Sequence, residues 1–143
     1  MSTPERPPLN GIVETALYVE DVERAAQFYE RVFGFSRMVS DGRFCAFNVG
    51  PGHVLLLFRQ GGTLEPATLP NGGVIPPHDG SGEQHFAFAI DRADVERWEA
   101  WLAANQAPVE SRVVWDRGGI SLYFRDPDRN LGELATPGIW VNY

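Results

Sequence analysis

Two stretches of the chain repeat one order of hydrophobic and polar positions: an alternating segment, then a segment with helical spacing. Residues 14–28 read ETALYVEDVERAAQF and residues 85–100 read HFAFAIDRADVERWEA, with the tetrapeptide DVER in both. A later pair also matches, VLLLF at 54–58 and LGELA at 131–135. Alternation indicates a strand and a 3.6-residue period indicates a helix. The sequence therefore predicts an internal repeat whose units each begin with a strand and a helix.

The first unit reads as one helix among four strands. Asp21 is the expected N-cap of the helix, and Gly34 supplies a left-handed C-terminal stop. Turn residues such as Asp41-Gly42 separate the segments that follow. The expected strands are 12–19, 36–41, 43–49 and 53–59.

The second unit follows a segment rich in Gly and Pro and repeats the pattern. We expect its helix at 93–104, with Val95, Trp98, Trp101 and Leu102 toward the core and Asn105 at its end. The expected strands are 85–90, 109–115, 119–125 and 130–136.

These elements predict an α+β fold of paired βαβββ modules, because one sheet with one helix leaves a face bare that a second sheet can share. The two sheets are expected to curl around a shared cavity, whose walls are the inward sides of the strands. The expected division is an N-terminal arm (1–10), a first module (11–60), a connector (61–82), a second module (83–138) and a C-terminal tail (139–143).

Composition narrows the classes of partner. The chain has 143 residues and a formal net charge of -7, which disfavours nucleic acid and anionic membrane surfaces. No apolar run approaches the roughly 20 residues that span a bilayer. Cys45 is the single cysteine and cannot form an internal disulfide; we expect it to be a small buried hydrophobe. We therefore expect a cytoplasmic protein that binds a small molecule.

Candidate chemistry lies on the inward faces of the first and last strands. Glu14 and His85 lie near the starts of the two matching strands, each among alanines that leave space beside a polar group. Glu133 stands in an apolar strand, where a lone carboxylate is costly unless it is paired or binds a cation. Two carboxylates and one imidazole could hold a divalent cation. The alternatives are an ion pair of Glu133 with Arg59 or Arg125, a core histidine and a solvated Glu14.

The sequence resembles the vicinal oxygen chelate superfamily, which includes glyoxalase I, fosfomycin-resistance proteins, extradiol dioxygenases and bleomycin-resistance proteins. The resemblance implies a homodimer of paired βαβββ modules, with metal ligands at Glu14, His85 and Glu133. The fourth position used by glyoxalase I falls on Leu56, which cannot coordinate, and members with three ligands usually carry His where this chain has Glu14. The segments that carry the resemblance are ETALYVEDVERAAQFYERVFGF, QHFAFAID and SLYFRDPDRNLGELATPG.

Three functional hypotheses follow. The favoured one is an enzyme whose divalent metal (Zn, Mn, Ni or Fe) acts as a Lewis acid on a substrate with neighbouring oxygens, with Glu14 or Glu133 as base. The reaction could be isomerisation or lyase chemistry, thiol addition or, with least support, dioxygenation. The second hypothesis is a metal-free protein of the bleomycin-resistance type that sequesters a ligand, and the third is a subunit with a relic site. Candidate pocket residues are Tyr18, Arg59, His78, Trp115, Arg117 and Tyr123, with His78 on a connector that could act as a lid; His53 is expected to be solvated.

Overall fold

The computed structural model describes residues 2–143 and contains two four-stranded sheets of identical connectivity. In the first half the strand order is β1-β4-β3-β2, and β1 runs parallel to β4. The predicted βαβββ unit is therefore confirmed, with boundaries within two residues of those expected. Its elements are β1 (Glu14–Val19), α1 (Val22–Phe33), β2 (Ser36–Ser40), β3 (Phe44–Gly50) and β4 (His53–Arg59).

The second half repeats the arrangement. Its strand order is β7-β10-β9-β8, again with the first and last strands parallel. The expected helix 93–104 is divided into a 3₁₀ turn and an α-helix. The predicted α+β fold of paired modules is confirmed. The elements are β7 (His85–Ala89), η1 (Arg92–Asp94), α2 (Val95–Ala104), β8 (Ser111–Val114), β9 (Ile120–Arg125) and β10 (Leu131–Ala135).

Helix α1 has the predicted end signals. The Asp21 carboxylate accepts a hydrogen bond from the Arg24 N–H at 3.1 Å, which satisfies one of the free amides of the first turn. Gly34 closes the helix at φ +68°, a left-handed conformation that glycine adopts without steric cost.

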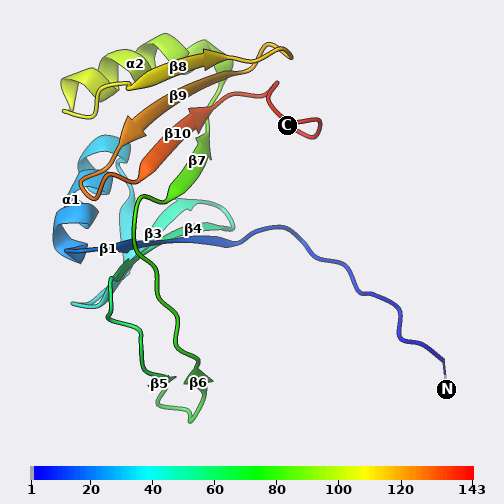
Figure 1. The fold of residues 1–143 in the computed structure, drawn as a ribbon. Helices are drawn as coiled ribbons and strands as arrows, with labels where there is room; N and C mark the ends of the chain where they lie inside the picture. Colours follow the sequence, from blue (N-terminus) through cyan, green and yellow to red (C-terminus); the bar gives the residue numbers. More distant parts are fainter. Residues whose placement is uncertain (1) are drawn as a thin grey trace.

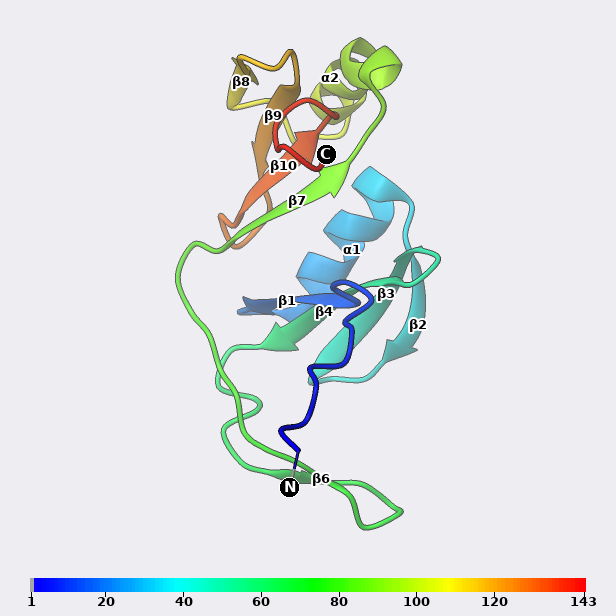
Figure 2. The same cartoon turned by 90° about the vertical axis from the view of Figure 1, so that its right-hand side faces the viewer.

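Helix α1 lies between the two sheets (Figure 2). Tyr29 packs on Phe47 of its own sheet at 6.4 Å between ring centroids, and on Phe86 of the other sheet at 6.1 Å. Phe33 extends the cross-sheet contact to Phe88 at 5.2 Å. The buried Tyr29 hydroxyl donates to Asp126 at 2.8 Å. The first helix therefore joins the two halves through one aromatic core.

Because α1 fills the space between the sheets, their opposite faces point outward. Ala16 on β1 and Ala87 and Ala89 on β7 are exposed, although alanines of this kind are often buried. Within one chain, these outward faces line two separate cavities, one on each sheet, and a third cavity of about 750 Å³ lies between β1 and β4 of the first sheet and β7 of the second.

The connector contains a feature that the sequence did not reveal. Two short strands, β5 (Ala67–Thr68) and β6 (Val74–Ile75), form a hairpin at the end of a long loop (Figure 1). Residues 2–13 form an extended arm without helix or strand. Among residues 2–143, no helix has the length and apolar character needed to cross a membrane.

The expectation for Trp101 was wrong. Trp98 is partly buried against the core, but Trp101 is 48% exposed. Its indole N–H donates to the Val32 carbonyl oxygen at 2.6 Å, near the end of α1. This side chain therefore bridges the ends of two helices, because an indole that keeps its N–H bonded can leave much of its ring in water. Cys45 is fully buried and His53 is exposed, as predicted.

Candidate functional site

Two of the three predicted ligands meet on the second sheet. The parallel register of β7 and β10 places His85 beside Leu131 and Glu133 beside Ala87. His85 Nε2 lies 3.2 Å from Glu133 Oε1. The other imidazole nitrogen, Nδ1, lies 2.7 Å from the Leu131 carbonyl oxygen. Because a carbonyl can only accept, Nδ1 carries a hydrogen; Nε2 then faces Glu133 with a lone pair in the neutral ring and with a second hydrogen in the imidazolium.

Glu133 is held by a hydrogen-bonded chain. The residue is only 8% exposed. Its Oε2 accepts from the Ser121 hydroxyl at 2.5 Å, and that hydroxyl oxygen accepts from the Trp115 indole N–H at 2.8 Å. One carboxylate oxygen is therefore occupied within the protein, and the other faces His85.

The contact between His85 and Glu133 needs a positive charge between its two atoms. A neutral Nε2 and a carboxylate oxygen are both acceptors, so at 3.2 Å they repel unless a proton or a cation lies between them. The charge on Glu133 also acts on Tyr123, the residue opposite it on β9. Burial, and then the negative charge of Glu133, raise the pKa of the Tyr123 phenol.

A cavity of about 570 Å³ opens beside this pair. Its walls combine the polar pair with aromatic rings and exposed alanines. The imidazole of His85 is half exposed at its mouth, whereas Glu133 lies at its base. The lining includes His85, Ala87, Ala89, Trp115, Tyr123, Glu133 and Trp140.

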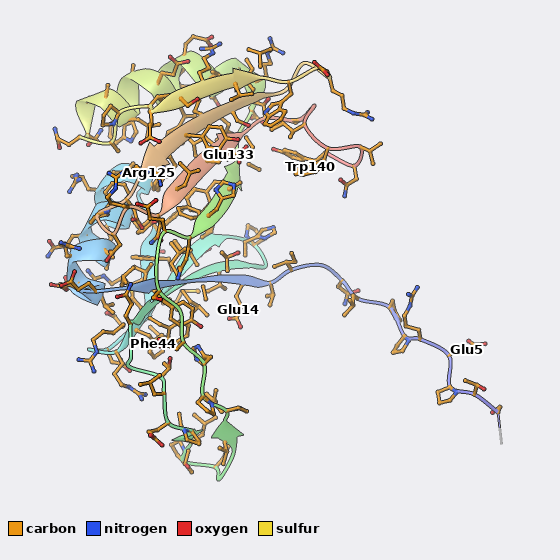
Figure 3. All side chains as sticks on the ribbon, in the orientation of Figure 1. Glu5, Glu14, Phe44, Arg125, Glu133 and Trp140 are labelled. Atoms are coloured by element: carbon orange, nitrogen blue, oxygen red, sulfur yellow. The ribbon has the colours of Figure 1, made fainter. Side chains whose placement is uncertain are left out.

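Glu14 lies apart from the His85–Glu133 pair in the structure. It projects from β1 on the first sheet, whereas Glu133 belongs to the other sheet (Figure 3). Within residues 2–143, no three side chains of the His, Cys, Asp or Glu type are grouped closely enough to hold one ion. The single chain thus assembles two of the predicted ligands and leaves the third apart.

Glu14 lines the cavity between the sheets and also a cavity of about 560 Å³ on the first sheet, which contains two further predicted pocket residues. The Tyr18 hydroxyl and His78 Nδ1 are 2.5 Å apart. Phe58 stacks on Tyr18 and on Phe44, with centroid distances of 5.7 and 5.8 Å. The connector, through His78, therefore covers part of the first sheet.

The remaining predicted residues lie away from the pair. Arg59 lines a separate depression with Asp21 and Asp41, and Arg117 is exposed in the turn after β8. Arg125 does not pair with Glu133, since its guanidinium bonds Glu110 at 3.2 Å.

The polar partner of Glu133 that the sequence analysis did not identify is Ser121. Strand alternation offered a signal, because Ser121 shares a face with Tyr123, the residue paired with Glu133.

The strand registers confirm the equivalence of positions that the repeat suggested. Glu14 pairs with Val54 as His85 pairs with Leu131, so Leu56 occupies on the first sheet the place of Glu133 on the second. Leu56 offers no donor atom for a cation.

The superfamily model described as "Glyoxalase/Bleomycin resistance protein/Dioxygenase superfamily" matches residues 11–134. The chain belongs to this superfamily. A superfamily member of known structure, a lactoylglutathione lyase from Agrobacterium tumefaciens, is 35% identical with a TM-score of 0.84, over 94% of this chain and 99% of that one. The fosfomycin resistance protein FosX from Mesorhizobium loti shares the fold, with a TM-score of 0.61 and 23% identity over 90% of this chain and 93% of that one.

Curated relatives point to the same superfamily. The metallothiol transferase FosB of Staphylococcus epidermidis is 30% identical over 121 residues, which are 82% of this chain and 75% of that protein. The FosB of Shouchella clausii is 27% identical over 131 residues, which are 90% of this chain and 81% of that protein.

The donor set on the second sheet fits a divalent cation. Imidazole nitrogen and carboxylate oxygen suit Zn, Mn, Ni and Fe. A bond from the distal imidazole nitrogen to a backbone oxygen is the usual support of a metal-binding histidine, and His85 has it. The observation that supports the fit is the 3.2 Å approach of His85 Nε2 to Glu133 Oε1, two atoms that can both coordinate a cation.

Proposed function

We propose that this protein is a metal-dependent enzyme acting on a small substrate with two neighbouring oxygens. His85 and Glu133 of one chain, with Glu14 of a second copy, hold a divalent cation (Zn, Mn, Ni or Fe) in a homodimer. The observation that carries the proposal is the 3.2 Å approach of His85 Nε2 to Glu133 Oε1. The bond to the Leu131 carbonyl oxygen uses the hydrogen on Nδ1, so it places no hydrogen between these two atoms.

The second copy is proposed because one chain leaves the site incomplete. Glu14 and the His85–Glu133 pair line different cavities, and both of these cavities open on exposed faces. Covering the exposed alanines of β7 with the first sheet of another copy would bury apolar surface, which is favourable. The same contact could bring the Glu14 carboxylate to the pair.

The residues of the chain have distinct tasks in this proposal. A bound cation supplies Lewis acidity that stabilises negative charge on a substrate oxygen. Glu133 is buried and fixed by Ser121, whereas Glu14 is exposed on β1. Glu14 is therefore the better placed group to take a proton from the substrate. Trp115 and Tyr123 shape the cavity and limit access of water.

Thiol chemistry is the reaction class that the relatives favour. One relative is named a metallothiol transferase and another a lactoylglutathione lyase, and both names refer to thiols or thiol adducts. We propose thiol addition, or lyase chemistry on a thiol adduct, ahead of dioxygenation.

The first test measures metal content and stability. We expect the purified protein to carry a divalent metal and to lose thermal stability with chelator, since binding to the folded state stabilises by RT ln(1 + [M]/Kd), about 4 kcal/mol at 1,000 times Kd. Glu133→Gln should abolish the chelator effect, and Glu20→Gln, an exposed control, should keep it. Absence of metal, with melting unmoved by Zn, Mn, Ni or Fe, contradicts the proposal.

The second test asks whether two chains share the site. Glu14→Gln and Glu133→Gln chains each lack a ligand, so neither alone should bind the cation tightly. In a mixed dimer, the Glu14 of one variant meets the intact His85–Glu133 pair of the other. Co-refolding should therefore restore binding at one site per mixed dimer. A site built within each chain predicts no recovery on mixing.

A specific observation keeps the metal-free alternative as the second candidate. The Tyr18–Phe58–Phe44 stack, beside the Glu14 carboxylate, would suit an aromatic cation. In this case an aromatic cation should quench fluorescence or raise the melting temperature equally with and without chelator.

A further inference from the structure

A chain of hydrogen bonds with a fixed direction supports Glu133 from behind. An indole N–H can only donate, so the Trp115 bond to Ser121 Oγ uses an acceptor site of the hydroxyl. The single hydroxyl hydrogen of Ser121 is then directed to Glu133 Oε2 at 2.5 Å. Both Ser121 and the carboxylate are buried, where a hydrogen bond to a charged group is strong.

The two carboxylate oxygens of Glu133 have different partners. Oε2 accepts from Ser121, while Oε1 faces His85 Nε2. We propose that Ser121, oriented by Trp115, is a positioning residue that presents Glu133 to a cation through a single oxygen and so favours ions that accept one oxygen per carboxylate. This inference rests on the proposed function, because it concerns how the same site selects its ion.

The chain of bonds is confined to the half that has the carboxylate. By strand register, Phe44 takes the place of Ser121 on the first sheet, and Leu56 takes the place of Glu133. The fold therefore does not require a hydroxyl at this position. A fully buried serine is costly unless its hydroxyl is bonded, and its bonds here lead to Glu133.

Ion preference follows from the number of oxygens that a carboxylate offers. Zinc sites use few ligands with fixed geometry, whereas Ca²⁺ accepts six to eight oxygens and often a bidentate carboxylate. Holding Glu133 by Oε2 favours the first kind of ion. Without Ser121, the carboxylate can rotate and offer both oxygens.

The test compares the affinities of metal-free full-length variants for Zn²⁺ and Ca²⁺ by competition with a chelator. We expect Ser121→Ala to weaken Zn²⁺ binding by roughly 10–100-fold, the usual effect of losing a supporting hydrogen bond. Binding of Ca²⁺ should be unchanged or tighter, so the ratio of the two affinities falls. Ser111→Ala, on the neighbouring strand β8, is the matched control and should leave both affinities unchanged.

A double-mutant cycle separates positioning from packing. Trp115→Phe should weaken Zn²⁺ binding in the wild-type chain and have no further effect in the Ser121→Ala chain, because both changes break one series of bonds. The visible spectrum of bound Co²⁺ should change with Ser121→Ala, since its intensity reports the coordination number. Melting of the metal-free variants verifies that each is folded.

The outcomes are distinct. If the wild type binds Zn²⁺ and Ser121→Ala binds it equally well with an unchanged Co²⁺ spectrum, the positioning role is overturned and the proposed function stands. Additive effects of the two substitutions also overturn it. If the wild type binds none of Zn, Mn, Ni or Fe, the proposed function and this inference both fall.

Discussion

The sheet faces that carry Glu14 and His85 have the same strand register but different chemistry. On the second sheet, His85, Glu133 and Ser121 form one bonded polar group. On the first sheet the equivalent positions are Glu14, Leu56 and Phe44, and only the first of them can bind a cation. The repeat thus preserves where side chains point and leaves their chemistry free to differ.

The difference has a simple physical basis. A buried carboxylate requires donors or a cation beside it, so Glu133 depends on the Ser121 hydroxyl and on a positive charge between it and His85. The first sheet has no buried carboxylate at position 56 and instead stacks aromatic rings with the Tyr18–His78 pair. The second sheet can therefore hold a cation, whereas the aromatic rings of the first sheet can cover an organic ligand.

The largest expected effect comes from giving the first sheet the residue that the second has. Leu56→Glu places a carboxylate in a half-buried position, and we expect it to lower the stability of the metal-free protein by about 1–3 kcal/mol. In the proposed dimer, this carboxylate also lies near the cation as a fourth ligand. Melting with and without Zn²⁺ should show a larger metal-induced shift than in the wild type.

Leu56→Gln provides the matched control, with the same size and no charge. It should show the loss of stability without the gain from metal. If Leu56→Glu gains no more from Zn²⁺ than this control, the two faces do not contribute to one site.

A smaller effect is expected at the connector. Tyr18→Phe removes the hydroxyl bonded to His78, at a cost of about 0.5–1.5 kcal/mol. The connector should then open more often, so limited proteolysis within residues 61–82 should be faster. Tyr123→Phe, the same change on the other sheet, should leave the cleavage rate unchanged. Equal cleavage of the Tyr18 variant and the wild type would show that this bond does not hold the connector.

The smallest effect concerns the tyrosines of the two faces. Burial and then Glu133 raise the pKa of Tyr123, whereas burial and then Asp79 raise the pKa of Tyr18. Glu133→Gln removes a negative charge that opposes phenolate formation. The pKa of Tyr123 should therefore fall part of the way toward 10.0, and that of Tyr18 should not change.

Alkaline absorbance titration, with Tyr123→Phe to assign the signal, measures these values. A raised pKa means that the folded chain binds more protons than the unfolded chain above about pH 10. Stability therefore falls as the pH rises from 10.0 through the raised value, and Glu133→Gln should narrow this range. An unchanged pKa of Tyr123 in the Glu133→Gln variant would show that the charge of Glu133 does not affect this phenol.

Much of the fold could be predicted from the sequence because its signals are local. The Asp21 cap, the Gly34 stop and the alternation around Glu14 and His85 each depend on a few neighbouring residues. The pairing of His85 with Glu133 followed from the repeat, since matching strands occupy matching places in the two sheets.

The rest depends on contacts that sequence patterns do not encode. The position of α1 between the sheets arises from Tyr29 and Phe33, whose partners lie far along the chain. Because of that packing, the sheet faces that were predicted to point inward point outward, and Glu14 is separated from the His85–Glu133 pair. The repeat alone did not indicate this separation. Strand alternation places Ser121 on the face of Tyr123, but its bond to Glu133 depends on the pairing of β9 with β10, which a lone serine in a strand does not reveal.

The bond that orients the His85 imidazole ends on the carbonyl oxygen of Leu131, which belongs to the backbone. Every amino acid supplies that oxygen, so position 131 can change over evolutionary time without altering the tautomer of the ring. Ser121 has no such freedom, because its contribution is a side-chain hydroxyl. The support of His85 by the backbone therefore tolerates substitution at position 131, whereas the support of Glu133 by Ser121 must be maintained by selection.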